Sequence, residues 1–388
     1  MDPGNVSPPD GPIGPEMAAG TWVAPAVQRA STVLFHDLDA FEAAAASRFE
    51  VPYYGRYGTA TTFALEDHIA RLEGADKTYA VSSGHAAITA AILAFLSPGD
   101  HILIPDGAYE PTKHLATGLL RQYGVNVDFY PGRAGAEIAS CCRPTTRLVW
   151  IEAPGSLTYE IAEIDEIVDF ARQKDIITIA DNTWASSCLF QPLQLGIDVS
   201  VVSATKYMSG HADVVGGFIS VHAKHRRRIE ATLVALGAAL SPDAAYLIWR
   251  GLQTMEIRLR HQAGSAAAIA TALSSDDRIG EVFHPALPSS PDHGRWRKYF
   301  AGSNGLLSFT LPRASRADMA AFISELKLIH LGVSWGGFEN LIFPKAMAAP
   351  AGGDQAVPWL VRLSVGLGDP AQILSDLDRA LSRLVPRY

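Results

Sequence analysis

Residues 199–217 read V-S-V-V-S-A-T-K-Y-M-S-G-H-A-D-V-V-G-G, an apolar run that leads into a lysine and a glycine pair. The run at 199–203 predicts a buried strand, because it is short, β-branched and preceded by an aspartate. Similar runs occupy 101–105, 147–153 and 176–180, and residues 161–174 carry apolar side chains at helical spacing. This alternation predicts an α/β fold with a mainly parallel sheet, helices on both faces and ligands beyond the carboxyl ends of the strands.

The pattern changes after about residue 244. A long helix is predicted over 245–273, with a loop at 352–354, strands at 305–311 and 360–365, and further helices at 317–326 and 370–384. This part of the chain reads as a smaller α+β domain. The length of 388 residues also suggests at least two domains.

The composition excludes several classes of protein. There are 32 Lys and Arg against 40 Asp and Glu, a formal net charge of −8, which disfavours nucleic acid and anionic membranes as main partners. No stretch reaches the ~20 uninterrupted apolar residues that span a bilayer. The 3 cysteines are an odd number and include an adjacent pair at 141–142, which favours the reducing cytoplasm over a disulfide-forming compartment. They form no Cys-x-x-Cys pair, which disfavours a zinc ribbon. Residues 1–20 are rich in Pro and Gly and lack Lys and Arg, so we expect a disordered tail, or an arm ordered only by a partner subunit, rather than a secretion signal.

Three polar features follow predicted strands. Ser82-Ser83-Gly84-His85 precedes an Ala-rich run at 86–96 that predicts a helix, whose first N–H groups suit a phosphate, although such a turn is more often a plain cap. Asp181 directly follows the 176–180 run, where a carboxylate can hold a cationic nitrogen or cap the next segment. Lys206 follows the 199–203 run, where partial desolvation lowers the pKa of an amine and makes it nucleophilic, although lysines commonly stand there for solubility.

Together, a phosphate cup, a carboxylate and an amine at one sheet edge are the parts that hold pyridoxal 5′-phosphate. Lys206 would form a Schiff base with it, and Asp181 would keep its pyridine nitrogen protonated.

Motifs of other enzyme classes are weaker. Residues 332–336 match the G-x-S-x-G pattern of a hydrolase nucleophile, but no histidine follows Ser334 in the chain as that fold requires. We also expect no metal site, because H-E-x-x-H is absent and the basic run at 222–228 is typical of a solvated helix face.

Seven motifs, spread from about residue 30 to the C-terminus, resemble the Cys/Met-metabolism family of pyridoxal-phosphate enzymes. They are Y-G-R-Y-G-T (54–59), A-Y-E-P (108–111), A-P-G-S-L-T-Y-E (153–160), A-D-N-T-W (180–184), A-T-K-Y-M-S-G-H-A-D-V-V-G-G (204–217), S-W-G-G-F-E (334–339) and L-V-R-L-S-V-G-L (360–367). The resemblance implies a type I aminotransferase-like fold, with a mainly parallel, mixed seven-stranded sheet in the large domain. It divides the chain into a tail (1–20), an arm contacting the neighbouring subunit (21–58), a cofactor-binding domain (59–245) and an α+β domain (246–388).

The resemblance also implies residues for the cofactor. Lys206 matches the cofactor lysine, Asp181 the partner of the pyridine nitrogen and Tyr109 the tyrosine stacked on the ring; Lys206 and Tyr109 are the implied catalytic residues. The phosphate cup is matched by the backbone of Gly84 and His85 and by the side chains of Ser203 and Thr205. Tyr54 and Arg56 match residues that reach the phosphate from a neighbouring subunit, so a homodimer is implied for the site and a tetramer is expected. His85 departs from the small or apolar residue expected at its position.

The implied substrate residues are Arg362, which matches the arginine that grips the α-carboxylate, with Ser334, Trp335 and Tyr246 in the same pocket. The implied activity is that of a carbon–sulfur lyase in methionine biosynthesis, or trans-sulfuration, which splits L-cystathionine by α,β-elimination into homocysteine, pyruvate and ammonia. The motifs at 54–59, 108–111 and 334–339 favour this β-chemistry. Family members with γ-synthase or γ-lyase chemistry stay an alternative, because they share Lys206 and Asp181, and so does a lyase for cystine or cysteine conjugates. A fold that has lost catalysis is disfavoured, since both Lys206 and Arg362 are present.

Overall fold

The computed structural model describes residues 23–347 and 356–384, so the tail expected at 1–20 and the loop expected at 352–354 lie outside the described residues. The larger sheet has seven strands in the order β1-β7-β6-β5-β4-β2-β3. Only β7 runs antiparallel to its neighbours, so the mainly parallel, mixed sheet is confirmed. Its strands are β1 Lys77–Val81, β2 His101–Pro105, β3 Asn126–Tyr130, β4 Thr146–Ile151, β5 Ile177–Asp181, β6 Val199–Ser203 and β7 Gly217–Val221.

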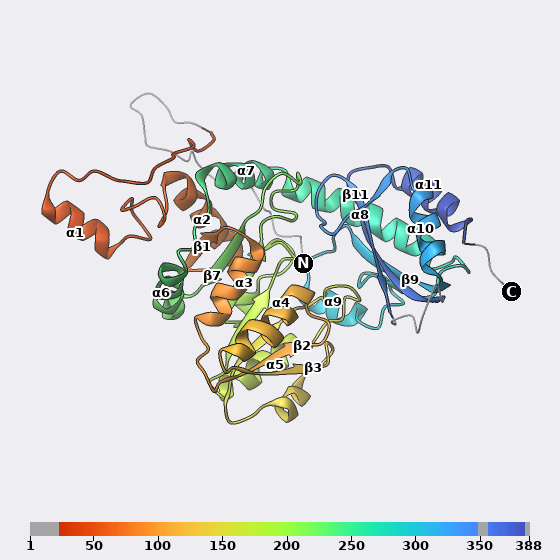
Figure 1. The fold of residues 1–388 in the computed structure, drawn as a ribbon, viewed down its shortest axis with the longest axis horizontal. Coiled ribbons are helices and arrows are strands. Elements are labelled where there is room, and N and C mark those ends of the chain that lie inside the picture. The colour runs from red at the N-terminus through yellow and green to blue at the C-terminus, as the bar shows by residue number, and fades with distance from the viewer. Residues whose placement is uncertain (1–22, 348–355, 385–388) are drawn as a thin grey trace.

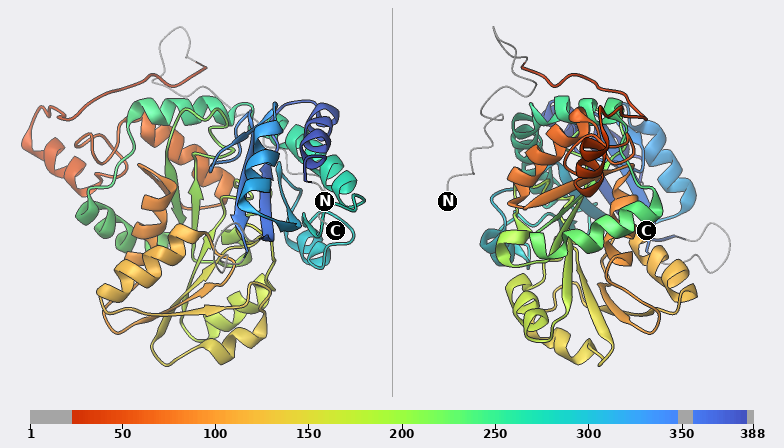
Figure 2. Two further views of the ribbon diagram at one scale, coloured as in Figure 1. Left: turned by 45° about the vertical axis from the view of Figure 1, so that its right-hand side comes forward. Right: turned by 90° about the vertical axis from the view of Figure 1, so that its left-hand side faces the viewer.

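Helices cover both faces of this sheet (Figures 1 and 2). One face carries α3 (Gly84–Leu93), α4 (Glu110–Leu115) and α6 (Arg226–Leu236). The other carries α2 (Ala60–Glu73), α5 (Ile164–Gln173) and α7 (Pro242–Leu252). The two-faced cover that the alternating pattern predicted is therefore present.

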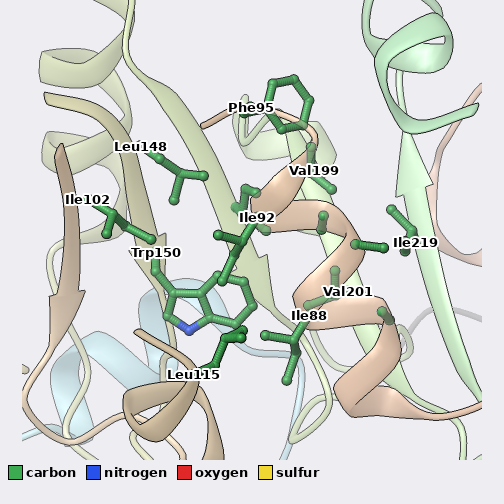
Figure 3. Packing of buried hydrophobic residues seen from close by; sticks show 14 of the residues in the cluster. Ile88, Ile92, Phe95, Ile102, Leu115, Leu148, Trp150, Val199, Val201 and Ile219 are labelled. Atoms are coloured by element: carbon green, nitrogen blue, oxygen red, sulfur yellow. The ribbon is translucent and has the colours of Figure 1, made fainter. Parts of the chain in front are cut away.

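The alternation of side chains along β4 shows how the sheet separates two cores. Leu148 and Trp150 are buried in the core on the α3 face, whereas Val149 and Ile151 are buried in the core on the α5 face. Figure 3 shows Ile92 of α3 beside Leu148 and Trp150. A strand buried on both faces has to be apolar throughout, which is why these strands appear in the sequence as short continuous apolar runs.

A second sheet of five strands, in the order β10-β11-β12-β9-β8, forms the smaller α+β unit. It is antiparallel except for the β10–β11 pair. The elements predicted at 305–311, 317–326, 360–365 and 370–384 correspond to β9, α10, β12 and α11. The elements of this unit are β8 Val282–Phe283, β9 Leu306–Ala314, β10 Ile329–Leu331, β11 Asn340–Ala346 and β12 Val357–Ser364, with α8 Met255–Leu273, α9 His293–Tyr299, α10 Arg316–Glu325 and α11 Pro370–Leu381.

The single helix predicted over 245–273 is wrong, because α7 ends at Leu252 and α8 begins at Met255. Gly251 lies against the chain at Ser209, where an added Cβ would stand 2.2 Å from the Ser209 carbonyl oxygen. Arg258 Nη2 donates to the Gly251 carbonyl oxygen at 2.7 Å and so satisfies a backbone group at the end of α7. The break depends on these packing contacts, which apolar spacing does not report.

The N-terminal part of the described chain extends away from both sheets and carries α1 (Leu38–Ala46), as Figure 1 shows. Leu34 and Leu38 of this arm are 92% and 66% exposed. Exposed apolar side chains on a projecting segment are typical of a surface that another subunit covers. No helix within the described ranges is long and apolar enough to cross a membrane.

Candidate active site

A cavity of about 230 Å³ lies at the carboxyl ends of β4, β5 and β6. This is where ligands bind in open α/β sheets, because the connections diverge there. The predicted site residues that line it are Gly84, His85, Tyr109, Asp181, Ser203, Thr205, Lys206 and Trp335. The cavity thus brings together residues from the ends of five strands, β1, β2, β4, β5 and β6, and from the loop before β11.

The start of α3 forms one wall of the cavity. Ser83 is the N-cap, and its Oγ accepts from the Ala86 N–H at 3.0 Å, so the plain cap that the sequence suggested is present. The helix nevertheless begins at Gly84, two residues earlier than predicted. An added Cβ on Gly84 would come within 2.4 Å of Ser203 Cβ, so only glycine allows the backbone to approach β6 this closely. The first N–H groups of a helix have no partner within it, which leaves them to bind an anion.

Asp181 ends β5, and no helix starts at it. Its Oδ1 accepts from the Thr183 N–H at 3.0 Å, so the carboxylate is fixed by a local turn rather than by a helix cap. Thr183 also accepts through Oγ1 from the Ser203 N–H at 2.9 Å, which ties the ends of β5 and β6 together. Burial raises the pKa of Asp181, while the Thr183 hydrogen bonds and the Lys206 ammonium oppose that rise. A partly buried carboxylate that lines the cavity is suited to a cationic nitrogen.

Lys206 lies three residues beyond β6 and is mostly buried. Its Nζ donates to Ser334 Oγ at 2.9 Å and lies 5.2 Å from the centre of the Trp335 ring. Burial, and then the positive charge of Arg362, lower the pKa of Lys206 to about 8, although Asp181 counteracts them. At neutral pH a minor but useful fraction of an amine with this pKa is uncharged, far more than for an ordinary lysine, and this fraction is available as a nucleophile or base.

Arg362 lies on β12 with 7% of its surface exposed. Its Nη2 donates to the carbonyl oxygens of Val333 at 2.7 Å and Ser334 at 3.2 Å, so it holds the loop that carries Ser334 to Lys206. Its Nε is buried and has no partner among the described residues. A buried guanidinium with an unused donor is suited to a carboxylate ligand.

Tyr109 precedes α4, and its side chain is 40% exposed toward the cavity. Tyr54 and Arg56 lie outside the cavity, on the N-terminal arm, where the Arg56 guanidinium lies 5.7 Å from the Tyr54 ring centre. Tyr246, on α7, does not line the cavity either. Ser334 and Arg362 do not line the cavity themselves but are joined to its Lys206 by hydrogen bonds, whereas Tyr54, Arg56 and Tyr246 have no such connection.

The sequence prediction missed several residues that line the cavity. Glu152 directly follows β4, which ends at Ile151, but the run predicted at 147–153 extended past it, so the search for polar residues after each run did not find it. Ser156 lies in the A-P-G-S-L-T-Y-E motif and Thr183 in A-D-N-T-W, and both could have been found there. Trp184 completes this side of the wall.

Comparison with known proteins identifies the group to which the chain belongs. The model of the Cys/Met metabolism PLP-dependent enzyme family matches residues 14–382. The chain belongs to this family. Its enzymes depend on pyridoxal phosphate, as the site residues led us to expect, and both the family and the fold predictions are confirmed.

Individual members of the family match over nearly the whole chain. The cystathionine β-lyase of Bordetella avium is 39% identical over 385 residues, covering 96% of this chain and 95% of that protein. The cystathionine β-lyase MetC of Escherichia coli K12 is 36% identical over 368 residues, covering 92% and 93%. The solved structure of a cystathionine γ-lyase from Lactobacillus plantarum, complexed with L-serine, has a TM-score of 0.84 at 29% identity and covers 95% and 96%.

The residues of the cavity fit the cofactor of this family. The glycine at the start of α3 leaves backbone N–H groups open to a phosphate, and Asp181 offers a partly buried carboxylate to a ring nitrogen. The mostly buried Lys206 amine offers a point of attachment, and the exposed Tyr109 ring offers a flat surface. Each part of pyridoxal phosphate therefore has a chemically matched group in one cavity.

Proposed function

We propose that this enzyme is a carbon–sulfur lyase that converts L-cystathionine and water into homocysteine, pyruvate and ammonia by α,β-elimination. The observation that carries the proposal is the Lys206 amine, which donates to Ser334 Oγ at 2.9 Å and whose pKa of about 8 reflects burial and the charges of Arg362 and Asp181. Relatives named cystathionine β-lyase that match over more than nine-tenths of the chain support the choice of substrate.

The cofactor would be held by the residues at the strand ends. Gly84 and His85 N–H groups, with Ser203 and Thr205 hydroxyls, would bind its phosphate. Asp181 would bind the pyridine nitrogen, Lys206 would hold the carbonyl carbon and Tyr109 would stack on the ring. When bound, pyridoxal phosphate supplies an electron sink for the negative charge that develops at the substrate Cα.

The chain's own groups then position the substrate and move its protons. Arg362 grips the α-carboxylate with its free Nε, and its bonds to the loop at 333–334 keep Ser334 next to Lys206. Lys206 Nζ, uncharged once it is released, removes the Cα proton. Ser334 Oγ, 2.9 Å from Nζ, holds the amine in place for that transfer. The negatively charged Asp181 keeps the ring nitrogen protonated while the β C–S bond breaks.

The product from L-cystathionine decides between β- and γ-chemistry. Pyruvate together with homocysteine is the expected result, and Lys206→Ala is expected to abolish both products and the visible absorbance of bound cofactor. Formation of 2-oxobutyrate with cysteine would instead make the enzyme a γ-lyase, which the similarity to the Lactobacillus structure keeps as the second candidate. Pyruvate from L-cystine but not from L-cystathionine would indicate a lyase for other cysteine derivatives.

The complete site requires a second subunit in this proposal, because Tyr54 and Arg56 are displayed on the arm and not in the chain's own cavity. We expect inactive Lys206→Ala and weakened Arg56→Ala chains, unfolded and refolded together, to recover activity. Random pairing leaves about one site in four with both side chains intact. Activity that stays at the level of the separate variants would contradict the shared site.

The free cysteines Cys141, Cys142 and Cys188 agree with a reducing compartment, so we also propose a cytoplasmic location.

A further inference from the structure

Glu152 lines the cavity but has no part in the roles assigned above. It follows β4, Asp181 ends β5, and these strands are neighbours in the sheet. Two carboxyl groups therefore meet at the sheet edge where the cofactor is placed. Two adjacent, partly buried carboxyl groups cannot both carry a full charge without a cost, so their environments decide which one holds a proton.

The Glu152 carboxyl binds the backbone of Tyr109. The Tyr109 N–H lies 3.0 Å from Oε1 and 2.9 Å from Oε2. Tyr109 stands immediately before α4, where backbone N–H groups have no partner within the helix. Glu152 therefore fixes the position of Tyr109 through its main chain and leaves the tyrosine ring and hydroxyl to the cavity.

The surroundings of the two carboxyl groups differ. Asp181 is hydrogen-bonded to Thr183 and lies near the Lys206 ammonium, whereas no lysine, arginine or histidine in the described part of the chain forms an ion pair with Glu152. Burial, and then the negative charge of Asp181, raise the pKa of Glu152 well above its ordinary range. The Tyr109 N–H and the Lys113 ammonium oppose this only in part.

The titratable and charged groups that interact electrostatically with Glu152 are Asp181 from β5, Tyr109 immediately before α4, Lys113 from α4 and Tyr130 from β3. Lys113 is the only cation in this set, and it is itself paired with Glu110 at 3.3 Å. The balance of charge around Glu152 is therefore unfavourable for a second carboxylate.

We propose that Glu152 is a neutral, protonated positioning residue, which fixes Tyr109 and leaves Asp181 as the charged member of the carboxyl pair. The inference rests on the proposed placement of the cofactor ring nitrogen against Asp181. A neutral carboxyl needs only its carbonyl oxygen to accept from Tyr109, so a glutamine amide can replace it in shape, charge and hydrogen bonding. Alanine removes the acceptor and leaves the Tyr109 N–H without its partner.

The test uses the full-length enzyme as wild type, Glu152→Gln and Glu152→Ala, with Glu137→Gln as a control that removes an exposed carboxylate outside the cavity. The first measurement is the dissociation constant of pyridoxal phosphate for the apoprotein, followed by visible absorbance. The second is the pH dependence of that absorbance. The third is the infrared difference spectrum between wild type and Glu152→Gln at pH 7, in the region of protonated carboxyl groups.

We expect Glu152→Gln and Glu137→Gln to bind the cofactor within about threefold of wild type, and Glu152→Ala to bind it at least about tenfold more weakly. A protonated carboxyl band should be present in wild type and absent from Glu152→Gln. The visible absorbance of the bound cofactor should titrate with the same midpoint in Glu152→Gln as in wild type. A midpoint that differs by about one pH unit or more would show that wild-type Glu152 is ionised, and would overturn the proposal.

Wild-type cofactor affinity in a folded Glu152→Ala would equally overturn the positioning role. If Glu152→Ala does not fold, the infrared band and the Glu152→Gln titration decide the question by themselves. These outcomes are distinct from failure of the proposed function, which would appear in the wild-type enzyme as an absence of cofactor binding or of pyruvate formation.

Discussion

Replacement of Arg362 by methionine tests the proposed recognition of the substrate α-carboxylate. Methionine keeps an unbranched apolar stem in a position that is 7% exposed, so the core around β12 loses little packing. The change removes the unpartnered Nε and the two bonds from Nη2 to the carbonyl oxygens of Val333 and Ser334. Both the carboxylate ligand and the support for Ser334 are lost.

The size of the effect follows from these contacts. Truncating one partner of a buried, hydrogen-bonded charge pair costs about 2–5 kcal/mol. Because the loop support is lost as well, we expect about 4 kcal/mol, which is roughly a 1,000-fold decrease in kcat/KM. Arg362→Lys keeps a charge but not the two-pronged geometry, and it should lose about 100-fold. Most of the loss should appear in KM.

The assay is pyruvate formation from L-cystathionine over a range of substrate concentrations. Arg313→Met is the matched control, because this arginine is exposed on β9 and should leave kcat/KM unchanged. Arg362 does not line the cavity, so the visible absorbance of bound cofactor should persist in every variant. A KM within threefold of wild type in Arg362→Met, or a loss of activity that merely follows lost cofactor, would refute the reasoning.

Two further predictions concern stability. Burial by itself raises the pKa of Asp198. Hydrogen bonds from His225, Lys224 and a backbone N–H outweigh this effect and lower that pKa well below its ordinary range. A carboxyl group whose pKa is lowered by folding stabilises the folded state at pH values above its unfolded pKa of about 3.9. Asp198→Asn should therefore decrease the free energy of unfolding by about 2 kcal/mol at pH 7, and by progressively less as the pH falls below about 4. A difference between variant and wild type that is the same at pH 7 and pH 3 in urea titrations would contradict this. Ile92→Ala, in the core on the α3 face, should decrease the free energy of unfolding by about 2–5 kcal/mol. Ile257→Ala is the control, because that residue is 69% exposed and its truncation should cost far less. Equal midpoints of unfolding for the two variants would argue against the packing in Figure 3.

The strands that carry the chemistry could be predicted because burial on both faces makes them apolar from end to end. The predicted runs at 101–105, 147–153, 176–180 and 199–203 correspond to β2, β4, β5 and β6. The polar residues after them, Asp181 and Lys206, line one cavity, because parallel strands place their carboxyl ends at one edge. By contrast, β7 was not predicted, since its place between β1 and β6 depends on pairing between segments far apart in the chain.

The sequence by itself determined the fold class, the family, the cofactor and the lysine, aspartate and tyrosine expected to hold it, because each depends on short-range patterns and on motifs that can be read locally. Only the tertiary structure joined Ser334 and Arg362 of the smaller unit to Lys206, split the helix predicted over 245–273, and bound the Glu152 carboxyl to the Tyr109 backbone. Those features depend on which strands become neighbours and on how closely backbones approach. Such contacts join residues far apart in the chain, and the spacing of residues along it does not encode them.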